Sequence, residues 1–535
     1  MIHLTFRRLF ILLLAGVAAA CASVSRGPAA SARKPLVVIL IVDQMRSEYL
    51  ETLGPRFTGG FRRLLDEGAW FRNAAYPYLN TITCAGHATI GTGALPYRHG
   101  MVLNEWWDRA AGKLNACTSD PSARGIGYMG TPAGGESANS LLAPTLAEQL
   151  RTGAGGRSVA LSLKPRSAIT LAGRNPNAVL WFDERAGWAT STAFTDKPVS
   201  WLQEFITANP VSADMGKTWD RLLPLSAYAG GDDMTGERTP SGWTRVFPHV
   251  LGEPAAQFLL HWQRSPFADA YLGRLAAHAI DTMDLGRGGG TDFISVSFST
   301  LDLVGHQYGP ESHETQDVLF RLDRTIGTLL DHLDARLGRD GYVLALSADH
   351  GVATLPEQTG GKRQPSAEII STINTALTPF FGAGKYVVQT AYTDIYLVPG
   401  TLERLRESPE ARAAVLDALR AMPGLSHAFL ADELKDPGVR TSADPVKRAA
   451  ALSFYPPRSG DIVVVPERYW LLSTSATTHG TLHPYDQRVP VIFFGAGVTK
   501  GVHEGPATPA DIAPTLAALV RAPFKPADGV VLIRP

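Results

Sequence analysis

Aspartate and histidine residues recur in short motifs along most of this 535-residue chain. They are Asp43 after an apolar run, Asp302 and His306 in DLVGH, Asp349 and His350 in ADHG, and His479 in TTHG. Carboxylate oxygens combined with imidazole nitrogens suit zinc better than magnesium or calcium. Three aspartates and three histidines are too many for one tetrahedral ion. They predict two zinc ions about 4 Å apart, an arrangement that can hold both the attacking and the leaving oxygen of a displacement.

These residues can form one site only if the fold brings them together. The apolar runs in the sequence indicate the class of that fold. Continuous β-branched runs at 36–42, 158–163, 293–299, 342–347 and 489–494 predict buried parallel strands. Helical spacing of apolar residues occurs at 61–69, 145–151, 313–338 and 508–522, and Thr508 with Asp511 forms a capping signal for the last. Strands that alternate with helices predict the α/β class, with a doubly wound, mostly parallel central sheet flanked by helices.

Charged residues follow four of the predicted strands. The strands lead into Asp43, Lys164, Asp302, and the pair Asp349 and His350. Any one aspartate after a strand is typically a turn or helix-cap residue. Because ligands bind at the carboxyl ends of strands in open α/β sheets, the set together predicts one site at that edge.

Two long stretches, at about 168–285 and 352–480, interrupt the alternation with Gly, Pro and Trp residues. We interpret them as large cap insertions within a single catalytic domain of residues 31–535. Trp181, Phe182 and Trp188 in the first stretch, with Tyr308 nearby, could line an entrance or pack in the core. The glycine run at 286–290 precedes a strand, so it predicts a turn and not a phosphate-binding loop.

Residues 1–30 resemble an export signal, with a basic start, a short apolar run and a small-residue cleavage region. The apolar run is too short to span a bilayer, so we expect no transmembrane span in the mature protein and a periplasmic or secreted location. Cys21 could carry a lipid anchor, as in an outer-membrane lipoprotein, or be lost by simple cleavage. Cys84 and Cys117 could pair in an oxidising compartment or remain free thiols. Fifty basic residues balance fifty acidic ones, which gives no reason to expect nucleic acid as a partner.

The motifs together resemble the alkaline phosphatase superfamily, and within it the phosphate-irrepressible bacterial alkaline phosphatases with a threonine nucleophile. The resemblance rests on Asp43 after its strand and on TCAGH (83–87), NEW (104–106), LKPRS (163–167), DLVGH (302–306), DHG (349–351) and THG (478–480). It implies that Asp43, Thr83, Asp349 and His350 hold one zinc ion. It also implies that Asp302, His306 and His479 hold the second.

The same resemblance implies roles for four catalytic residues. Thr83 would be the nucleophile, because zinc, which lowers the pKa of bound water to about 7, can likewise favour an alkoxide. Cys84 is a rival nucleophile without an evident activator, and we expect His87 to be a hydrogen-bonding residue and not a ligand. Asn104 would donate its amide to a phosphoryl oxygen. Lys164 and Arg166 would bind the substrate and favour a monoester dianion over a diester.

The sequence therefore predicts an exported di-zinc alkaline phosphatase that hydrolyses small-molecule phosphate monoesters through a phosphothreonine intermediate. A phosphodiesterase or nucleotide pyrophosphatase of the same superfamily is the first alternative, because it would share everything except the two cations. A sulfatase, a phosphonate hydrolase and a non-catalytic zinc-binding surface protein are further alternatives. The physiological substrate and the oligomeric state leave no readable trace in the sequence.

Overall fold

The computed structural model describes residues 34–525 and 527–534. The predicted signal at 1–30, with Cys21, lies outside the described residues. None of the described helices is both long and apolar enough to cross a membrane.

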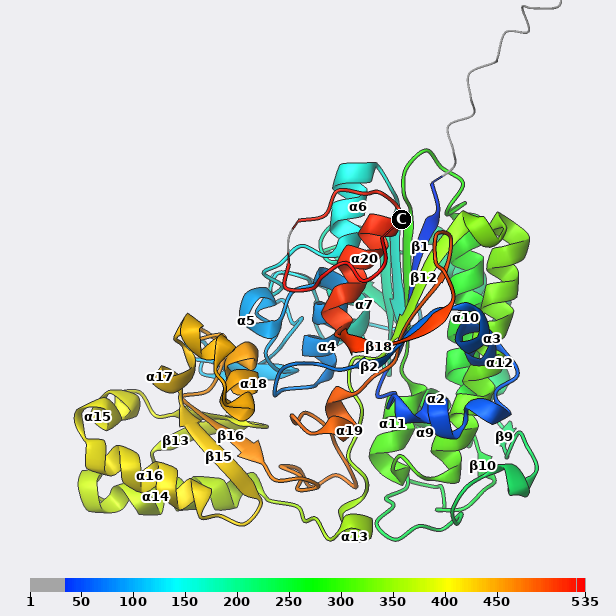
Figure 1. Cartoon of the computed structure of the whole chain (residues 1–535). Coiled ribbons are helices and arrows are strands. Elements are labelled where there is room, and N and C mark those ends of the chain that lie inside the picture. Colours follow the sequence, from blue (N-terminus) through cyan, green and yellow to red (C-terminus); the bar gives the residue numbers. More distant parts are fainter. Residues whose placement is uncertain (1–33, 526, 535) are drawn as a thin grey trace, which may run out of the picture.

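A ten-stranded sheet runs through the middle of the molecule (Figure 1). From one edge to the other its strands are β18 (Gly501–Ala507), β2 (Ala69–Ala74), β17 (Val491–Gly495), β12 (Tyr342–Ser347), β1 (Leu36–Val42), β11 (Phe293–Phe298), β6 (Ser158–Ser162), β7 (Ala178–Asp183), β8 (Gly187–Ser191) and β5 (Gly125–Gly127). The neighbouring strands from β12 to β7 are parallel. The predicted doubly wound, mostly parallel sheet is confirmed.

Helices cover both faces of this sheet, which is why its central strands are apolar on both sides (Figure 1). Alternate side chains of β1 enter two different cores. Val38 and Leu40 share a core with α3 (Gly60–Glu67), α10 (Pro266–Thr282) and α12 (His313–Leu337). Val37 and Ile39 share the other with α4 (Thr83–Thr92), α6 (Leu146–Ala154), α7 (Pro165–Ala172) and α20 (Ile512–Leu519).

One strand direction differs from the prediction. The run at 489–494 was expected to be parallel, but β17 is antiparallel to both of its neighbours, β12 and β2. A strand buried on both faces is continuously apolar whichever way it runs, so the apolar pattern carries no direction.

The first predicted insertion also begins later than expected. The stretch from about 168 contains β7 and β8, which extend the central sheet. Trp181, Phe182 and Trp188 are buried in the core of this region and line no entrance, and Tyr308 is buried as well. Gly173 and Pro176, just before β7, interrupt the regular alternation of strands and helices from which the sheet was predicted.

The stretch 352–480 forms a second, smaller unit beside the main sheet (Figure 1). Its antiparallel sheet has the order β13 (Val387–Ala391), β14 (Asp394–Leu397), β16 (Ile462–Pro466) and β15 (Leu425–Leu430). Helices α14 (Ser366–Phe381) and α16 (Pro409–Arg420) pack on this sheet around a hydrophobic core of their own.

Glu314, in the first turn of α12, is fully buried, with its Oε1 2.8 Å from Nε2 of His249. Burial raises the pKa of Glu314 to about 9, so the folded protein keeps a proton that the unfolded chain releases near pH 4.5. The contribution of Glu314 to the free energy of unfolding is therefore fully present below pH 4.5 and is lost as the pH rises toward 9. The slope is about 1.4 kcal/mol of unfolding free energy per pH unit.

Replacing Glu314 by glutamine should remove this contribution, because the amide keeps the shape of the side chain without titrating. Urea unfolding at pH 6 and pH 8 measures the difference. Between these values the wild-type protein should lose more stability than Glu314→Gln, by up to about 2 to 3 kcal/mol. Equal losses in the two proteins would show that Glu314 is already ionised in the folded state.

Candidate active site

The candidate site lies at the carboxyl edge of four neighbouring parallel strands. Asp43 directly follows β1, Asp349 and His350 follow β12, and Lys164 follows β6. Asp302 and His306 lie one turn apart on α11 (Thr300–Tyr308), which follows β11. The sheet thus brings together residues that are more than 300 positions apart in the sequence, as the strand ends predicted.

Three histidines are oriented in the same way. The Nδ1 atoms of His306, His350 and His479 lie 3.0, 2.9 and 3.0 Å from the backbone carbonyl oxygens of Thr477, Gly351 and Thr81. Because a carbonyl oxygen only accepts, each ring carries its proton on Nδ1 when neutral and presents the lone pair of Nε2. This is the arrangement that metal-binding histidines have in proteins.

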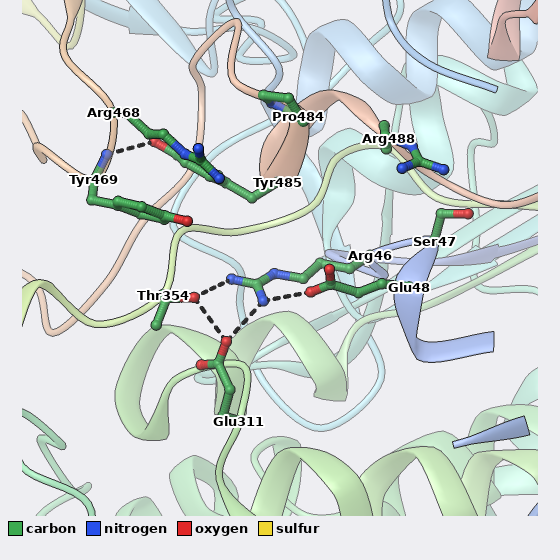
Figure 2. A pocket seen from close by; sticks show the side chains of 10 residues that line it. All are labelled: Arg46, Ser47, Glu48, Glu311, Thr354, Arg468, Tyr469, Pro484, Tyr485 and Arg488. Atoms are coloured by element: carbon green, nitrogen blue, oxygen red, sulfur yellow. Dashed lines mark hydrogen bonds and ion pairs between the residues drawn. The ribbon is translucent and has the colours of Figure 1, made fainter. Parts of the chain in front are cut away.

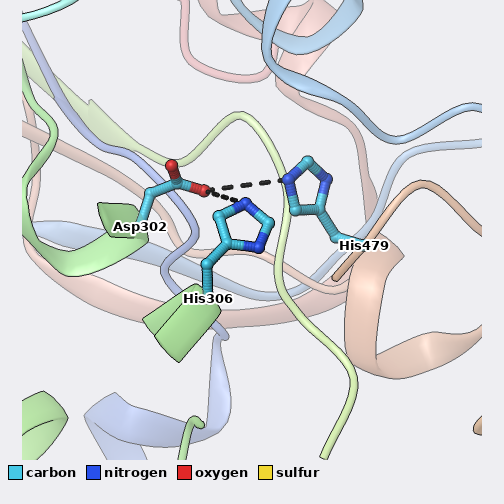
Figure 3. A group of neighbouring side chains, drawn as sticks. All are labelled: Asp302, His306 and His479. Atoms are coloured by element: carbon cyan, nitrogen blue, oxygen red, sulfur yellow. Dashed lines mark ion pairs between the residues drawn. The ribbon is translucent and has the colours of Figure 1, made fainter. Parts of the chain in front are cut away.

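The three Nε2 atoms face aspartate oxygens. Those of His306 and His479 lie 3.2 and 3.7 Å from Oδ1 of Asp302 (Figure 3). That of His350 lies 3.2 Å from Oδ2 of Asp349 and 3.5 Å from Oδ1 of Asp43. Asp43 Oδ1 and Asp349 Oδ2 are buried and accept no well-aligned hydrogen bond within the described part of the chain, and Nδ1 of His87 lies 3.1 Å from Asp349 Oδ2. Buried carboxylate oxygens without donors fit a bound cation.

The ligand atoms are grouped tightly enough to hold metal ions. Two sets of three, Asp302 with His306 and His479, and Asp43 with Asp302 and His350, each have their ligand atoms within 4.8 Å of one another. A third such set joins Asp43, Asp349 and His87. His87, however, uses both ring nitrogens: Nδ1 lies 3.0 Å from the carbonyl oxygen of Thr83, and Nε2 lies 2.8 Å from Ser297 Oγ. His87 is thus the hydrogen-bonding residue that the sequence predicted.

The charges of the buried site are strongly coupled to one another. Burial raises the pKa of Asp43 to about 7, and repulsion from Asp302 and Asp349 acts in the same direction. Burial by itself would lower the pKa of His350, but Asp349 and Asp43 outweigh it and raise that pKa to about 9. Burial, followed by repulsion from His350 and His306, lowers the pKa of His479 well below its usual range. This shift favours the neutral form of His479, in which Nε2 can bind a cation.

Thr83 is the first residue of α4 and is buried, with its Oγ1 3.4 Å from Nε2 of His350. The hydroxyl therefore lies beside the candidate ligands and at a helix end whose backbone N–H groups attract anions. The neighbouring Cys84 forms a disulfide with Cys117. This pairing leaves no free thiol at position 84 to compete as a nucleophile.

Asn104 lies over the start of the same helix. Its Oδ1 accepts a hydrogen bond of 2.9 Å from the backbone N–H of Cys84. It lines a cavity of about 210 Å³, whose other lining residues include His306, His479, Tyr392 and Glu105. The predicted phosphate-binding amide thus lies at the mouth of the site, beside two of the candidate ligands.

Lys164 has a different immediate partner from the predicted one. Its Nζ lies 2.6 Å from Oδ2 of Asp43 and 2.5 Å from Oδ2 of Asp302. Burial alone would lower the pKa of Lys164, but the carboxylates of Asp302 and Asp43 outweigh it and raise that pKa. Arg166, at the start of α7, has a buried Nε without a hydrogen-bond partner among the described residues. Lys164 therefore already pairs with two carboxylates, whereas the Nε of Arg166 is available to bind a ligand.

A separate pocket contains Arg46, whose guanidinium holds together two loops that follow strands of the site (Figure 2). Arg46 Nε donates 2.8 Å to the carbonyl oxygen of Val352, just after the DHG motif, and Nη2 donates 2.9 Å to Thr354 Oγ1. Nη1 pairs with Glu48 at 2.7 Å and with Glu311 at 2.9 Å. The guanidinium thereby ties the loop after Asp43 to the loop after His350.

Gln44 is a residue of the site that sequence reasoning missed. Its Nε2 donates 2.8 Å to Oδ1 of Asp302, and its backbone N–H donates 3.1 Å to Oδ1 of Asp349. Its backbone has φ +72°, a left-handed conformation that is uncommon outside glycine. Its position directly after Asp43 was the only feature of the sequence that could have indicated this role. Hydrophobic periodicity predicts strands and helices, and it does not identify single residues that hydrogen-bond to a ligand.

Two glycines in the motifs are required by close packing around these residues. A Cβ on Gly305 would lie 1.9 Å from Oε1 of Gln44, and a Cβ on Gly86 would lie 2.1 Å from the carbonyl oxygen of Asp349. The glycines of DLVGH and TCAGH thus let α11 and α4 approach the strand ends.

Known proteins share both the sequence and the fold of this chain. The family of type I phosphodiesterases and nucleotide pyrophosphatases matches residues 37–486. The chain belongs to this family. An alkaline phosphatase, PafA, of Elizabethkingia meningoseptica is 31% identical over 92% of both chains. An alkaline phosphatase, PhoV, of Synechococcus elongatus is 30% identical over 92% of this chain and 91% of its own. These relatives confirm the resemblance to the alkaline phosphatase superfamily.

Solved structures also support the assignment of this chain to the alkaline phosphatase superfamily. The crystal structure of PafA matches with a TM-score of 0.84 at 30% identity and covers 94% of this chain and 99% of that one. A murine ectonucleotide pyrophosphatase/phosphodiesterase 5 matches with a TM-score of 0.53 at 14% identity, which shows a shared fold alone. This member of the family is therefore an enzyme of the alkaline phosphatase type, with the alkaline-phosphatase-like fold that the sequence predicted.

Proposed function

We propose that this protein is an exported alkaline phosphatase whose single catalytic domain, residues 31–535, uses two zinc ions and Thr83 to hydrolyse phosphate monoesters. The observation that carries the proposal is the set of three imidazoles whose Nε2 atoms face buried carboxylates next to the Thr83 hydroxyl. The two relatives named as alkaline phosphatases support the phosphomonoesterase activity.

The resemblance to the superfamily implies the ligand assignment, and the grouping of Asp302, His306 and His479 supports one half of it. Asp302, His306 and His479 would hold one ion, and Asp43, Thr83, Asp349 and His350 the other. The two ions, when bound, would lower the pKa of the Thr83 hydroxyl and neutralise charge on the leaving oxygen. Asp43 and Asp302 both bind Lys164 through Oδ2. This leaves Oδ1 of Asp43 without a donor among the described residues, whereas Oδ1 of Asp302 also accepts a hydrogen bond from Gln44.

Residues of the chain carry out the attack on phosphorus and bind the phosphoryl oxygens. Thr83 Oγ attacks phosphorus in line with the leaving oxygen, and a phosphothreonine forms as the alcohol departs. Water hydrolyses this ester and releases inorganic phosphate. Asn104 donates its amide to one phosphoryl oxygen. The N-terminal end of α4, where the N–H of Cys84 is already bonded to Asn104, favours the developing charge through the helix dipole.

Substrate rates test the proposal directly. Purified protein loaded with zinc should hydrolyse a simple aryl phosphate monoester at least about 100-fold faster, in kcat/KM, than the corresponding diester or sulfate ester. A higher rate on the diester would instead favour a phosphodiesterase. No hydrolysis of any of these esters would favour a non-catalytic zinc-binding protein.

Arg166 is the side chain expected to set the preference for monoesters. A monoester dianion carries one more negative charge than a diester, and the guanidinium can bind two phosphoryl oxygens at once. Arg166→Ala should therefore lower kcat/KM for the monoester by about 100-fold and for the diester by less than about 10-fold. Arg185→Ala, at an exposed position on the turn between β7 and β8, is the matched control and should change neither. Equal losses on both esters would exclude this role.

Export completes the proposal. The signal-like residues 1–30 and the disulfide between Cys84 and Cys117 support a periplasmic or secreted location, because disulfides persist in oxidising compartments. Lipidation at Cys21 would anchor the enzyme to the outer membrane, and simple cleavage would release it. Mass spectrometry of the mature N-terminus distinguishes these two outcomes.

A further inference from the structure

The disulfide between Cys84 and Cys117 joins the two chain segments that flank Asn104 in the sequence. Cys84 is the second residue of α4 and directly follows Thr83. Cys117 directly follows β4 (Lys113–Ala116), which pairs with β3 (Glu105–Asp108) in a two-stranded hairpin that starts after Asn104. The bond therefore joins the helix that carries the nucleophile to the base of the hairpin that carries the phosphate-binding amide.

Both cysteines also bind Asn104 through their backbone amides. The N–H of Cys84 donates 2.9 Å to the side-chain Oδ1 of Asn104, and the N–H of Cys117 donates 2.9 Å to its backbone oxygen. Asn104 is thus held at its side chain by one half of the disulfide and at its backbone by the other half. The contact from Cys84 depends on the distance between α4 and the hairpin, which the disulfide fixes with a Cα–Cα separation of 6.7 Å. The contact from Cys117 closes the hairpin next to the pair Glu105 and Ala116.

These contacts determine which way the amide points. A backbone N–H can only face an acceptor, so the atom beside Cys84 must be Oδ1, and the Nδ2 donor is turned away from it. Asn104 lines the cavity with His306 and His479, and no acceptor within the described part of the chain takes its Nδ2. The hairpin has only two strands and is separate from the main sheet. Such a hairpin is marginally stable by itself. Its strands and turn are attached through the buried Trp106 and through Arg109, which bonds to Ser459 and Asp461, and the disulfide attaches its base.

We propose that the disulfide between Cys84 and Cys117 is a positioning element of the phosphoryl site. It holds Asn104 at a fixed distance from Thr83, so that the Nδ2 donor is aligned before the substrate binds. The inference rests on the proposed phosphatase function and assigns no chemical step to the sulfur atoms. Its energetic basis is pre-organisation, since a displacement of about 1 Å at such a group can cost up to 100-fold in rate.

A mutant cycle tests whether the disulfide acts through Asn104. The four proteins are wild type, Asn104→Ala, the double variant Cys84→Ala/Cys117→Ala, and the triple variant. Loss of the disulfide should lower kcat/KM for an aryl monoester about 10-fold when Asn104 is present, and less than 2-fold when Asn104 is already alanine. Zinc content and thermal unfolding are measured on all four proteins. The same factor in both backgrounds, or no loss in the first, would overturn the inference.

Reversible reduction covers the case in which the double variant folds poorly. Because Cys84 and Cys117 are buried, wild-type enzyme is reduced with a phosphine that does not bind zinc in urea below its unfolding transition and then returned to buffer, and free thiols and metal content are counted. Activity should fall about 10-fold as two thiols appear, with zinc unchanged, and should return on reoxidation. The Asn104→Ala enzyme should lose less than 2-fold under the same treatment, and an equal loss would contradict the inference. A wild-type enzyme without monoesterase activity would refute the proposed function instead, so the two failures are distinguishable.

Discussion

Replacing Thr83 by alanine is expected to lower kcat for phosphate monoesters by about 10⁴-fold or more, because it removes the attacking oxygen. The disulfide at Cys84 leaves no thiol beside this position to replace it. The three aspartates and three histidines that we propose as ligands remain, so most of the zinc should stay bound. Steady-state rates, measured together with the metal content of the purified variant, provide the test.

The conservative variant Thr83→Ser is the matched control, since it keeps a hydroxyl in the same place. It should retain activity within about 10-fold of wild type and should trap a phosphoserine at acid pH. Thr83→Ala with normal metal content and more than one per cent of the wild-type rate would show that another group attacks phosphorus.

Removing the metal ions is expected to have an effect of similar size. Dialysis against a chelator should lower kcat/KM at least about 1,000-fold, because the hydroxyl of Thr83 would then keep its ordinary high pKa and the leaving oxygen would lose its countercharge. Zinc should restore the rate. Full activity after proven removal of all metal would exclude the two-ion scheme.

His479→Ala tests one ligand group separately. The variant should bind one ion fewer per chain and lose at least about 1,000-fold in kcat/KM, because Asp302 and His306 alone leave that ion weakly held. His427→Ala, at a half-buried position on β15 in the smaller sheet, is the control and should keep both ions and the full rate. If His479→Ala keeps wild-type metal content, His479 is not a ligand.

Much of the site could be predicted because charged residues follow recognisable strands. β1, β6, β11 and β12 are continuous apolar runs, so the strand pattern alone was enough to place Asp43, Lys164, Asp302, Asp349 and His350 at one edge of the sheet. His479 and Asn104 follow no strand of the main sheet. They could be assigned only through the order of motifs that resembles the superfamily.

Other features depend on tertiary contacts that no local pattern encodes. The direction of β17 is set by its place between β12 and β2, and the membership of β7 in the main sheet is set by its pairing with β6. Gln44 donates a hydrogen bond to Asp302, and Lys164 forms ion pairs with Asp43 and Asp302. These contacts form only where the ends of several strands meet in the folded chain. Sequence spacing likewise left open whether Cys84 and Cys117 pair.

The most direct test of the two-ion site is a crystal of the zinc-loaded enzyme measured on both sides of the zinc absorption edge. We expect two anomalous peaks per chain, about 4 Å apart. One should lie among Asp302, His306 and His479, and the other among Asp43, Thr83, Asp349 and His350. A single peak, or zinc bound away from these side chains, would contradict the account.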